Sequence, residues 1–113
     1  MRRSLATCLA LFFLAMTYRI EPVSAQVLYG SALGIVEDQT NAAVVGAAVT
    51  ITNRSTGAVR ETKSGTDGRY TFPNLLAGIH EVKGIAAGFR TYSQANVQIS
   101  INTVTRVDVR LEL

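Results

Sequence analysis

The nine residues Ser64-Gly-Thr-Asp-Gly-Arg-Tyr-Thr-Phe72 decide the fold class of this chain. Asp67-Gly68 is a dipeptide typical of tight turns, and the alternation behind it puts Tyr70 and Phe72 on one face of an extended segment. The sequence therefore predicts a tight turn that leads into a β-strand with one aromatic, buried face.

Two segments upstream of this turn alternate with the period of a strand. In Gly30–Glu37, Leu33 and Ile35 share one face, whereas Gly34 and Val36 share the other.

The segment Val45–Thr52 predicts a strand whose inward face is formed by Ala47, Val49 and Ile51. The polar segment Ala58–Lys63 follows, and its charged side chains disfavour pairing with other chains. We therefore expect it at the edge of a sheet.

Downstream of the turn, Pro73 predicts the end of the aromatic strand, because proline has no N–H for a ladder. The next strand is expected at Ile79–Ala86, where Gly84 indicates a bulge or a close backbone approach. A turn follows it, and we expect Phe89 of this turn to fold back onto the core.

Two alternating segments end the chain. The first is marked by Val97, Ile99 and Ile101, and the second is Val104–Leu113. In the second, the residues on one face are Val107, Val109, Leu111 and Leu113. Seven short segments separated by turn residues at roughly ten-residue intervals predict an all-β sandwich of seven strands in two sheets.

Composition and charge exclude several other classes. The chain has 113 residues, enough for one small domain, and 48% of them are hydrophobic. The formal charge is +3, but three of the eleven Lys/Arg and one of the eight Asp/Glu lie in the first 25 residues. The rest of the chain is nearly neutral, so the charge gives no support for binding to nucleic acid.

The first 25 residues are typical of a cleaved signal peptide. Arg2-Arg3 precedes the uncharged run Leu5–Met16, which as a helix spans about 18 Å. That is too short for a bilayer core of about 30 Å. Pro22 and the small residues that follow it favour cleavage before Gln26.

Two alternatives for this segment are weaker. Cys8 stands near the start of the apolar run, whereas a lipidated cysteine follows such a run, and the arginine pair lacks the polar flank of a twin-arginine signal. We therefore expect residues 1–25 to be a signal peptide and residues 26–113 to be one domain without cysteine. This mature domain has no predicted transmembrane segment.

Five segments carry a resemblance to a known family. They are Gly34-Ile-Val-Glu-Asp38, Val45-Gly-Ala-Ala-Val-Thr-Ile51, Thr66-Asp-Gly-Arg-Tyr-Thr-Phe72, Asn74-Leu-Leu-Ala-Gly78 and Ala87-Gly-Phe-Arg90. In this order and spacing, the chain resembles a carboxypeptidase regulatory-like domain from Gly30 to Leu113. The resemblance implies a transthyretin-like Greek-key sandwich in which these motifs form turns and core and carry no catalysis.

The lead-in Gln26-Val-Leu-Tyr-Gly30 is similar to the N-terminus of Oar-type TonB-dependent outer-membrane receptors. That resemblance implies a bacterial envelope location, in the periplasm or outer membrane, with a receptor plug and barrel or another envelope protein as partner. The chain departs from the pattern because it stops at Leu113, before any plug or barrel. It also has Leu76-Ala77 where prolines are usual and His80 where tyrosine is common.

The residues offer little for catalysis. His80 is the only histidine and has no cysteine partner in the mature chain. Asp67 could pair with Glu37 or Asp38 as acid and base, but an aspartate before glycine is an ordinary turn residue. We therefore predict no enzyme, no catalytic residue, no metal ligand and no cofactor.

The predicted function is a non-catalytic envelope module for protein–protein or ligand interaction. The resemblance implies that it is the N-terminal extension, or a truncated piece, of a TonB-dependent outer-membrane receptor, or a short stand-alone relative. The alternative is a carbohydrate-binding module, since the fold resembles modules that stack sugars on aromatic rings. Tryptophan is absent, so Tyr29 and Tyr92 are the weak candidates for a ligand-binding site.

Overall fold

The computed structural model describes residues 28–113. The predicted signal peptide and its cleavage site lie outside the described residues. The strands are β1 (Tyr29–Glu37), β2 (Ala48–Asn53), β3 (Val59–Lys63), β4 (Arg69–Leu76), β5 (Gly78–Ile85), β6 (Tyr92–Ile99), β7 (Val104–Arg106) and β8 (Val109–Arg110). No helix occurs between residues 28 and 113.

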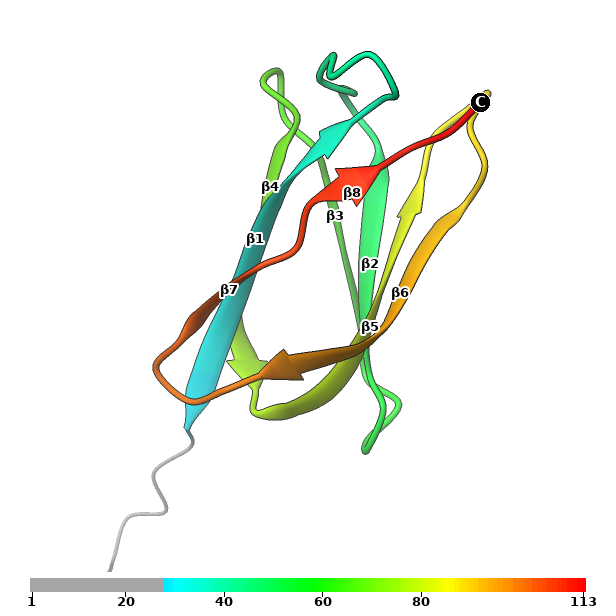
Figure 1. The fold of residues 1–113 in the computed structure, drawn as a ribbon. Helices are drawn as coiled ribbons and strands as arrows, with labels where there is room; N and C mark the ends of the chain where they lie inside the picture. Colours follow the sequence, from blue (N-terminus) through cyan, green and yellow to red (C-terminus); the bar gives the residue numbers. More distant parts are fainter. Residues whose placement is uncertain (1–27) are drawn as a thin grey trace, which may run out of the picture.

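The strands form two sheets that face each other across one core (Figure 1). The first sheet has the order β4-β1-β7, with β8 also paired to β1, and the second has the order β3-β2-β5-β6. The predicted all-β, two-sheet architecture is confirmed. Residues 28–113 form eight strands because the last predicted strand is divided into β7 and β8.

Strand β1 is central to the first sheet. It pairs with β4 in the antiparallel sense and with β7 and β8 in the parallel sense. The first strand of the domain thus lies beside its last two strands. Main-chain bonds from Val107 N to Leu33 O and from Leu111 N to Glu37 O, both 2.8 Å, join them.

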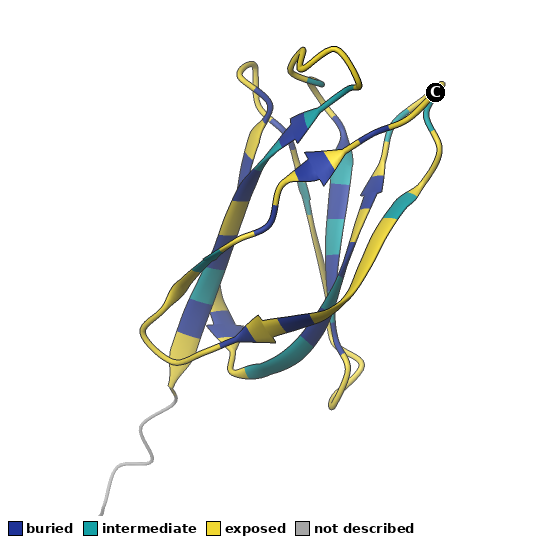
Figure 2. Ribbon diagram, viewed as in Figure 1, coloured by how far each residue is buried: buried dark blue, intermediate teal, exposed yellow. Residues whose placement is uncertain are grey.

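Along β1, β2 and the first half of β4, buried residues alternate with more exposed ones, as Figure 2 shows. Ala47, Val49 and Ile51 are buried, as predicted. Tyr70 and Phe72 are buried too, with their rings edge to face at 5.9 Å between centroids. These apolar inner faces form the core that joins the two sheets.

The strand expected at residues 58–63 is confirmed as an edge strand, β3. One of its charged residues also closes the sandwich. Arg60 Nη1 donates to the carbonyl of Pro73 on β4 at 2.6 Å, and its guanidinium lies 5.8 Å from the centroid of the Phe72 ring. Arg60 therefore links the edges of the two sheets.

The prediction that Pro73 ends its strand is wrong, because β4 continues to Leu76. The register with β1 shifts between Phe72 and Leu75, and Asn74 takes a φ of 56° there. Because β4 is an edge strand, the missing N–H of proline costs no ladder bond.

At Gly84 a side chain, and not another backbone, makes the close approach: a Cβ there would lie 2.6 Å from Cγ1 of Val109. The bulge of this strand lies elsewhere, in the β5–β6 register between His80 and Val82. Phe89 is half-buried and packs against the core, as expected.

The C-terminal predictions are confirmed in part. Val97, Ile99, Val107, Val109 and Leu111 are buried. The assignments of Ile101 and Leu113 to the apolar faces are wrong.

Both of these side chains are exposed, because Ile101 lies in the turn after β6 and Leu113 lies beyond β8. The break between β7 and β8 falls at Asp108. There the carboxylate Oδ1 accepts the main-chain N–H of Ile35 at 3.1 Å. A side chain thus replaces a ladder acceptor at this point in the sheet.

Candidate functional site

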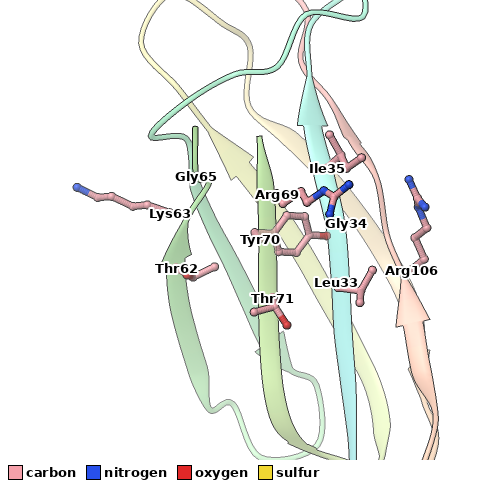
Figure 3. A pocket seen from close by; sticks show the side chains of 10 residues that line it. All are labelled: Leu33, Gly34, Ile35, Thr62, Lys63, Gly65, Arg69, Tyr70, Thr71 and Arg106. Atoms are coloured by element: carbon pink, nitrogen blue, oxygen red, sulfur yellow. The ribbon is translucent and has the colours of Figure 1, made fainter. Parts of the chain in front are cut away.

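A hollow of about 570 Å³ opens beside β4 and extends over the first sheet. Its volume lies within the range of roughly 300–1,000 Å³ that is usual for ligand pockets. The residues that line it are Leu33, Gly34, Ile35, Thr62, Lys63, Gly65, Arg69, Tyr70, Thr71 and Arg106 (Figure 3). Three of them are cations and none is an acid, so the lining is basic.

The register of the strands determines which side chains lie next to one another in this hollow. Leu33 and Ile35 lie on the outer face of β1, opposite Thr71 and Arg69 of β4. On the other side of β1, Arg106 of β7 is the parallel partner of Leu33. Aliphatic side chains of a central strand are thus flanked by a guanidinium on each neighbouring strand.

Acidic neighbours orient both guanidinium groups through Nε. Arg69 Nε lies 3.4 Å from Oδ2 of Asp67, and Arg106 Nε donates to both carboxylate oxygens of Asp108 at 3.0 and 3.1 Å. All four side chains are more than half exposed. Such exposed pairs add little stability, and in the structure each acid lies on the Nε side of its arginine.

The floor of the hollow is formed by Gly34 and Tyr70. A Cβ on Gly34 would lie 1.9 Å from the carbonyl oxygen of Val107, so only glycine fits beneath the ring. The Tyr70 hydroxyl donates to that same carbonyl. Burial raises the pKa of Tyr70 well above its ordinary range, and the charge of Asp108 acts in the same direction. The phenol therefore stays neutral and serves as a structural donor.

The two tyrosines predicted as ligand candidates lie apart. Tyr29 begins β1 beside Leu76, whereas Tyr92 begins β6 beside Gly84, at the opposite end of the sandwich (Figure 1). Tyr29 is 41% exposed and lines two smaller hollows of about 260 and 270 Å³.

Tyr92 packs partly against the core, and its hydroxyl donates to Oε1 of Gln94 at 2.6 Å. Burial raises the pKa of Tyr92. The structure does not bring these rings into one surface, and neither lines the basic hollow.

The residues considered for catalysis have local structural partners. His80 is buried, and its Nδ1 lies 3.1 Å from the carbonyl oxygen of Gly78, so this nitrogen carries the proton in that bond. Asp38 accepts from the main-chain N–H groups of Thr40 and Ala42, and hydrogen bonds from Thr40 hold the pKa of Asp38 below its usual value. These are the bonds of turn and strand residues.

Asp67 likewise accepts the main-chain N–H of Arg69 at 3.1 Å. Among residues 28–113, no group of three or more His, Cys, Asp or Glu side chains is placed to hold a metal ion. In the same range, no helix is long and apolar enough to cross a membrane.

Sequence reasoning did not identify Arg69 and Arg106 as site residues. The signal available in the sequence was that each arginine alternates with buried residues, which places it on an outer face of its sheet. Their proximity to Leu33 and Ile35 depends on the pairing of β1 with both β4 and β7, and no local pattern shows this pairing.

Similar folds occur in solved structures. A candidate carbohydrate-binding protein from Bacteroides uniformis is 17% identical, with a TM-score of 0.59 over 72% of this chain and 40% of that one. Catechol 1,2-dioxygenase from Pseudomonas arvilla is 12% identical, with a TM-score of 0.62 over 82% and 55%. The pilus 2b backbone protein of group B streptococcus is 18% identical, with a TM-score of 0.56 over 85% and 46%.

At such identities these likenesses show the fold alone. The chain matches about half or less of the length of each of these three proteins. No curated protein matches the sequence.

A family comparison is more specific than the structural ones. The model of the carboxypeptidase regulatory-like domain matches residues 32–112, which is most of the chain and includes every strand from β2 to β8. The motifs that suggested this family lie within the match. The chain therefore belongs to the carboxypeptidase regulatory-like domain family.

Proposed function

We propose that this protein is a non-catalytic interaction module of the bacterial envelope. The observation that carries the proposal is the basic hollow, where oriented arginines flank exposed aliphatic side chains. The acids near it are engaged with main-chain N–H groups and arginines, so the hollow offers recognition groups and no nucleophile–base pair.

The module acts as the N-terminal extension of a TonB-dependent outer-membrane receptor. The lead-in at residues 26–30 and the predicted signal peptide support this proposal, because both match the start of Oar-type receptors. The mature protein is then exported to the periplasm or outer membrane, and its partner is a receptor plug and barrel or another envelope protein.

A blot of fractionated envelope tests the receptor proposal. An antiserum raised against residues 26–113 is used on soluble periplasm and on outer membrane from the source cells. A band far larger than 113 residues allow, found in the outer membrane, is expected. A soluble periplasmic band of the size of the mature chain would overturn the receptor assignment and identify a free-standing module.

Carbohydrate binding is a second candidate, favoured by the exposed ring of Tyr29 above two small hollows. The likeness to the candidate carbohydrate-binding protein of Bacteroides uniformis is consistent with it. Affinity gels with immobilised polysaccharides test this function. Selective retention that is lost in Tyr29→Ala or Tyr92→Ala would favour the sugar, whereas unchanged mobility on every gel would argue against it.

A further inference from the structure

Arg69 and Arg106 combine an oriented guanidinium with free terminal nitrogens. Each uses Nε on an acidic neighbour, and within residues 28–113 neither donates from Nη to another group. By contrast, Arg54, Arg60 and Arg110 each donate from Nη to protein oxygens. The two arginines of the hollow therefore keep the donors that bind carboxylates in a forked geometry.

The register fixes the spacing of these two arginines. Arg69 lies opposite Ile35 on one side of β1, and Arg106 lies opposite Leu33 on the other. Two strand spacings and an offset of two residues separate their Cα atoms by about 12 Å. Leu33, which is 39% exposed, and Ile35 occupy the space between them (Figure 3).

We propose that this face binds an extended acidic peptide segment of a protein partner. Side chains four residues apart on one face of an extended peptide are separated by about 13 Å, which matches the two arginines. Two carboxylates at that spacing would pair with Arg69 and Arg106. An aliphatic side chain midway between them would lie between Leu33 and Ile35. This inference rests on the proposed function as an interaction module and names its ligand.

The surface favours a peptide over an acidic sugar. Tyr70 carries the only aromatic ring that lines the hollow, and it is 5% exposed. No ring face is therefore open for a sugar to stack on. Exposed Leu33 and half-buried Ile35 suit an aliphatic side chain of the same size.

The probe is a fluorescein-labelled peptide with the core Asp-Thr-Val-Thr-Asp, added to the purified exported protein and followed by fluorescence anisotropy. We expect binding that weakens with added salt, because the contacts are exposed charges. Arg69→Ala with Arg106→Ala should weaken binding about tenfold. Arg54→Ala, which removes an exposed cation outside the hollow, is the matched control and should change affinity less than about twofold.

Two further variants separate binding from folding. Leu33→Ser should weaken peptide binding while leaving the denaturation midpoint near that of the parent, since the side chain is on the outer face. The peptide with Asn in place of both Asp should bind at least about tenfold more weakly.

Equal binding of the Asn peptide, no binding of the Asp peptide, or undiminished binding by the double arginine variant would overturn the inference. Tighter competition by oligogalacturonate than by unlabelled peptide would also overturn it, in favour of an acidic sugar. The envelope blot is independent of these outcomes, so failure here and failure of the receptor proposal are distinguishable.

Discussion

Charged side chains are paired differently on the outer faces of the two sheets. On the β3-β2-β5-β6 sheet, Glu81 accepts from Arg54 at 2.9 Å and from Ser93 at 3.1 Å, and it lies 3.7 Å from Nζ of Lys83. Glu81 thus has three partners, and we refer to Glu81, Arg54, Ser93 and Lys83 as the closed cluster. On the β4-β1-β7 sheet, each arginine meets one acid through Nε and keeps its terminal nitrogens.

The contrast teaches that one core can support two outer faces whose charges are paired in different ways. The central strands β1 and β2 alternate regularly, and both sheets contribute buried residues to the core (Figure 2). What differs is the pairing of the charges named above: Glu81 has three partners, whereas Arg69 and Arg106 each pair with one acid. The predictions that follow test this difference, beginning with the core that both faces share.

The largest effect is expected from Phe72→Ala, because this ring is buried between the sheets. The free energy of unfolding should fall by about 3–5 kcal/mol, enough to unfold a small domain. Chemical denaturation followed by circular dichroism measures it. Val59→Ala, on the exposed edge of β3, is the control; a loss under about 1 kcal/mol for Phe72→Ala would show that the faces do not share this core.

Asp108→Ala should have an intermediate effect confined to the first sheet. It removes the acceptor of the Ile35 N–H and the partner of Arg106, so the free energy of unfolding should fall by about 1–2 kcal/mol. Asp108→Asn keeps an oxygen acceptor, and denaturation curves should show a smaller loss. Equal losses in both variants would mean that the charge matters and the ladder contact does not.

The pair of Arg54 and Glu81 should contribute less. A double-mutant cycle with Arg54→Ala and Glu81→Ala is expected to give a coupling of about 0.2–1 kcal/mol, as for other exposed pairs. The same cycle on Arg69 and Asp67, whose contact is longer at 3.4 Å, should give no more. A larger coupling for the second pair would reverse the comparison between the faces.

The smallest effect is a pH dependence. Hydrogen bonds from Ser93 and Arg54 hold the pKa of Glu81 below its usual value. Because the unfolded chain binds the proton more readily, this contribution is present above the ordinary pKa of glutamate, about 4.3, and is lost as the pH falls through the lower folded value. Glu81→Gln should flatten the acid limb of the denaturation midpoint, whereas an unchanged limb would count against a closed cluster.

Much of the fold follows from local pattern. The inward face of β2 and the buried pair Tyr70 and Phe72 obey the two-residue period, and the charged side chains of β3 fit its place at a sheet edge. The sequence predictions fail where a contact between residues far apart in the sequence outweighs the local pattern. Pro73 was expected to end a strand, yet its free carbonyl accepts a bond from Arg60 of the other sheet.

The last strand and the site were harder to predict for the same reason. The sequence of residues 104–113 alternates without interruption, but the ladder is broken where the Asp108 carboxylate replaces a main-chain acceptor. The basic hollow requires Arg69 and Arg106, 37 positions apart by their residue numbers, to flank one strand. Alternation predicts that each points outward, but only sheet order shows that they flank Leu33 and Ile35.

The parallel pairing of β1 with β7 and β8 determines how the domain responds to a pulling force. The described chain enters at one end of the sandwich with Tyr29 and reaches Leu113 at the other (Figure 1). Tension between these residues runs along the strands, so the bonds that join β1 to the last strands are loaded in shear and share the force. An antiparallel pair of terminal strands would instead be unzipped one bond at a time. A force applied between Tyr29 and Leu113 is therefore expected to be shared by these bonds.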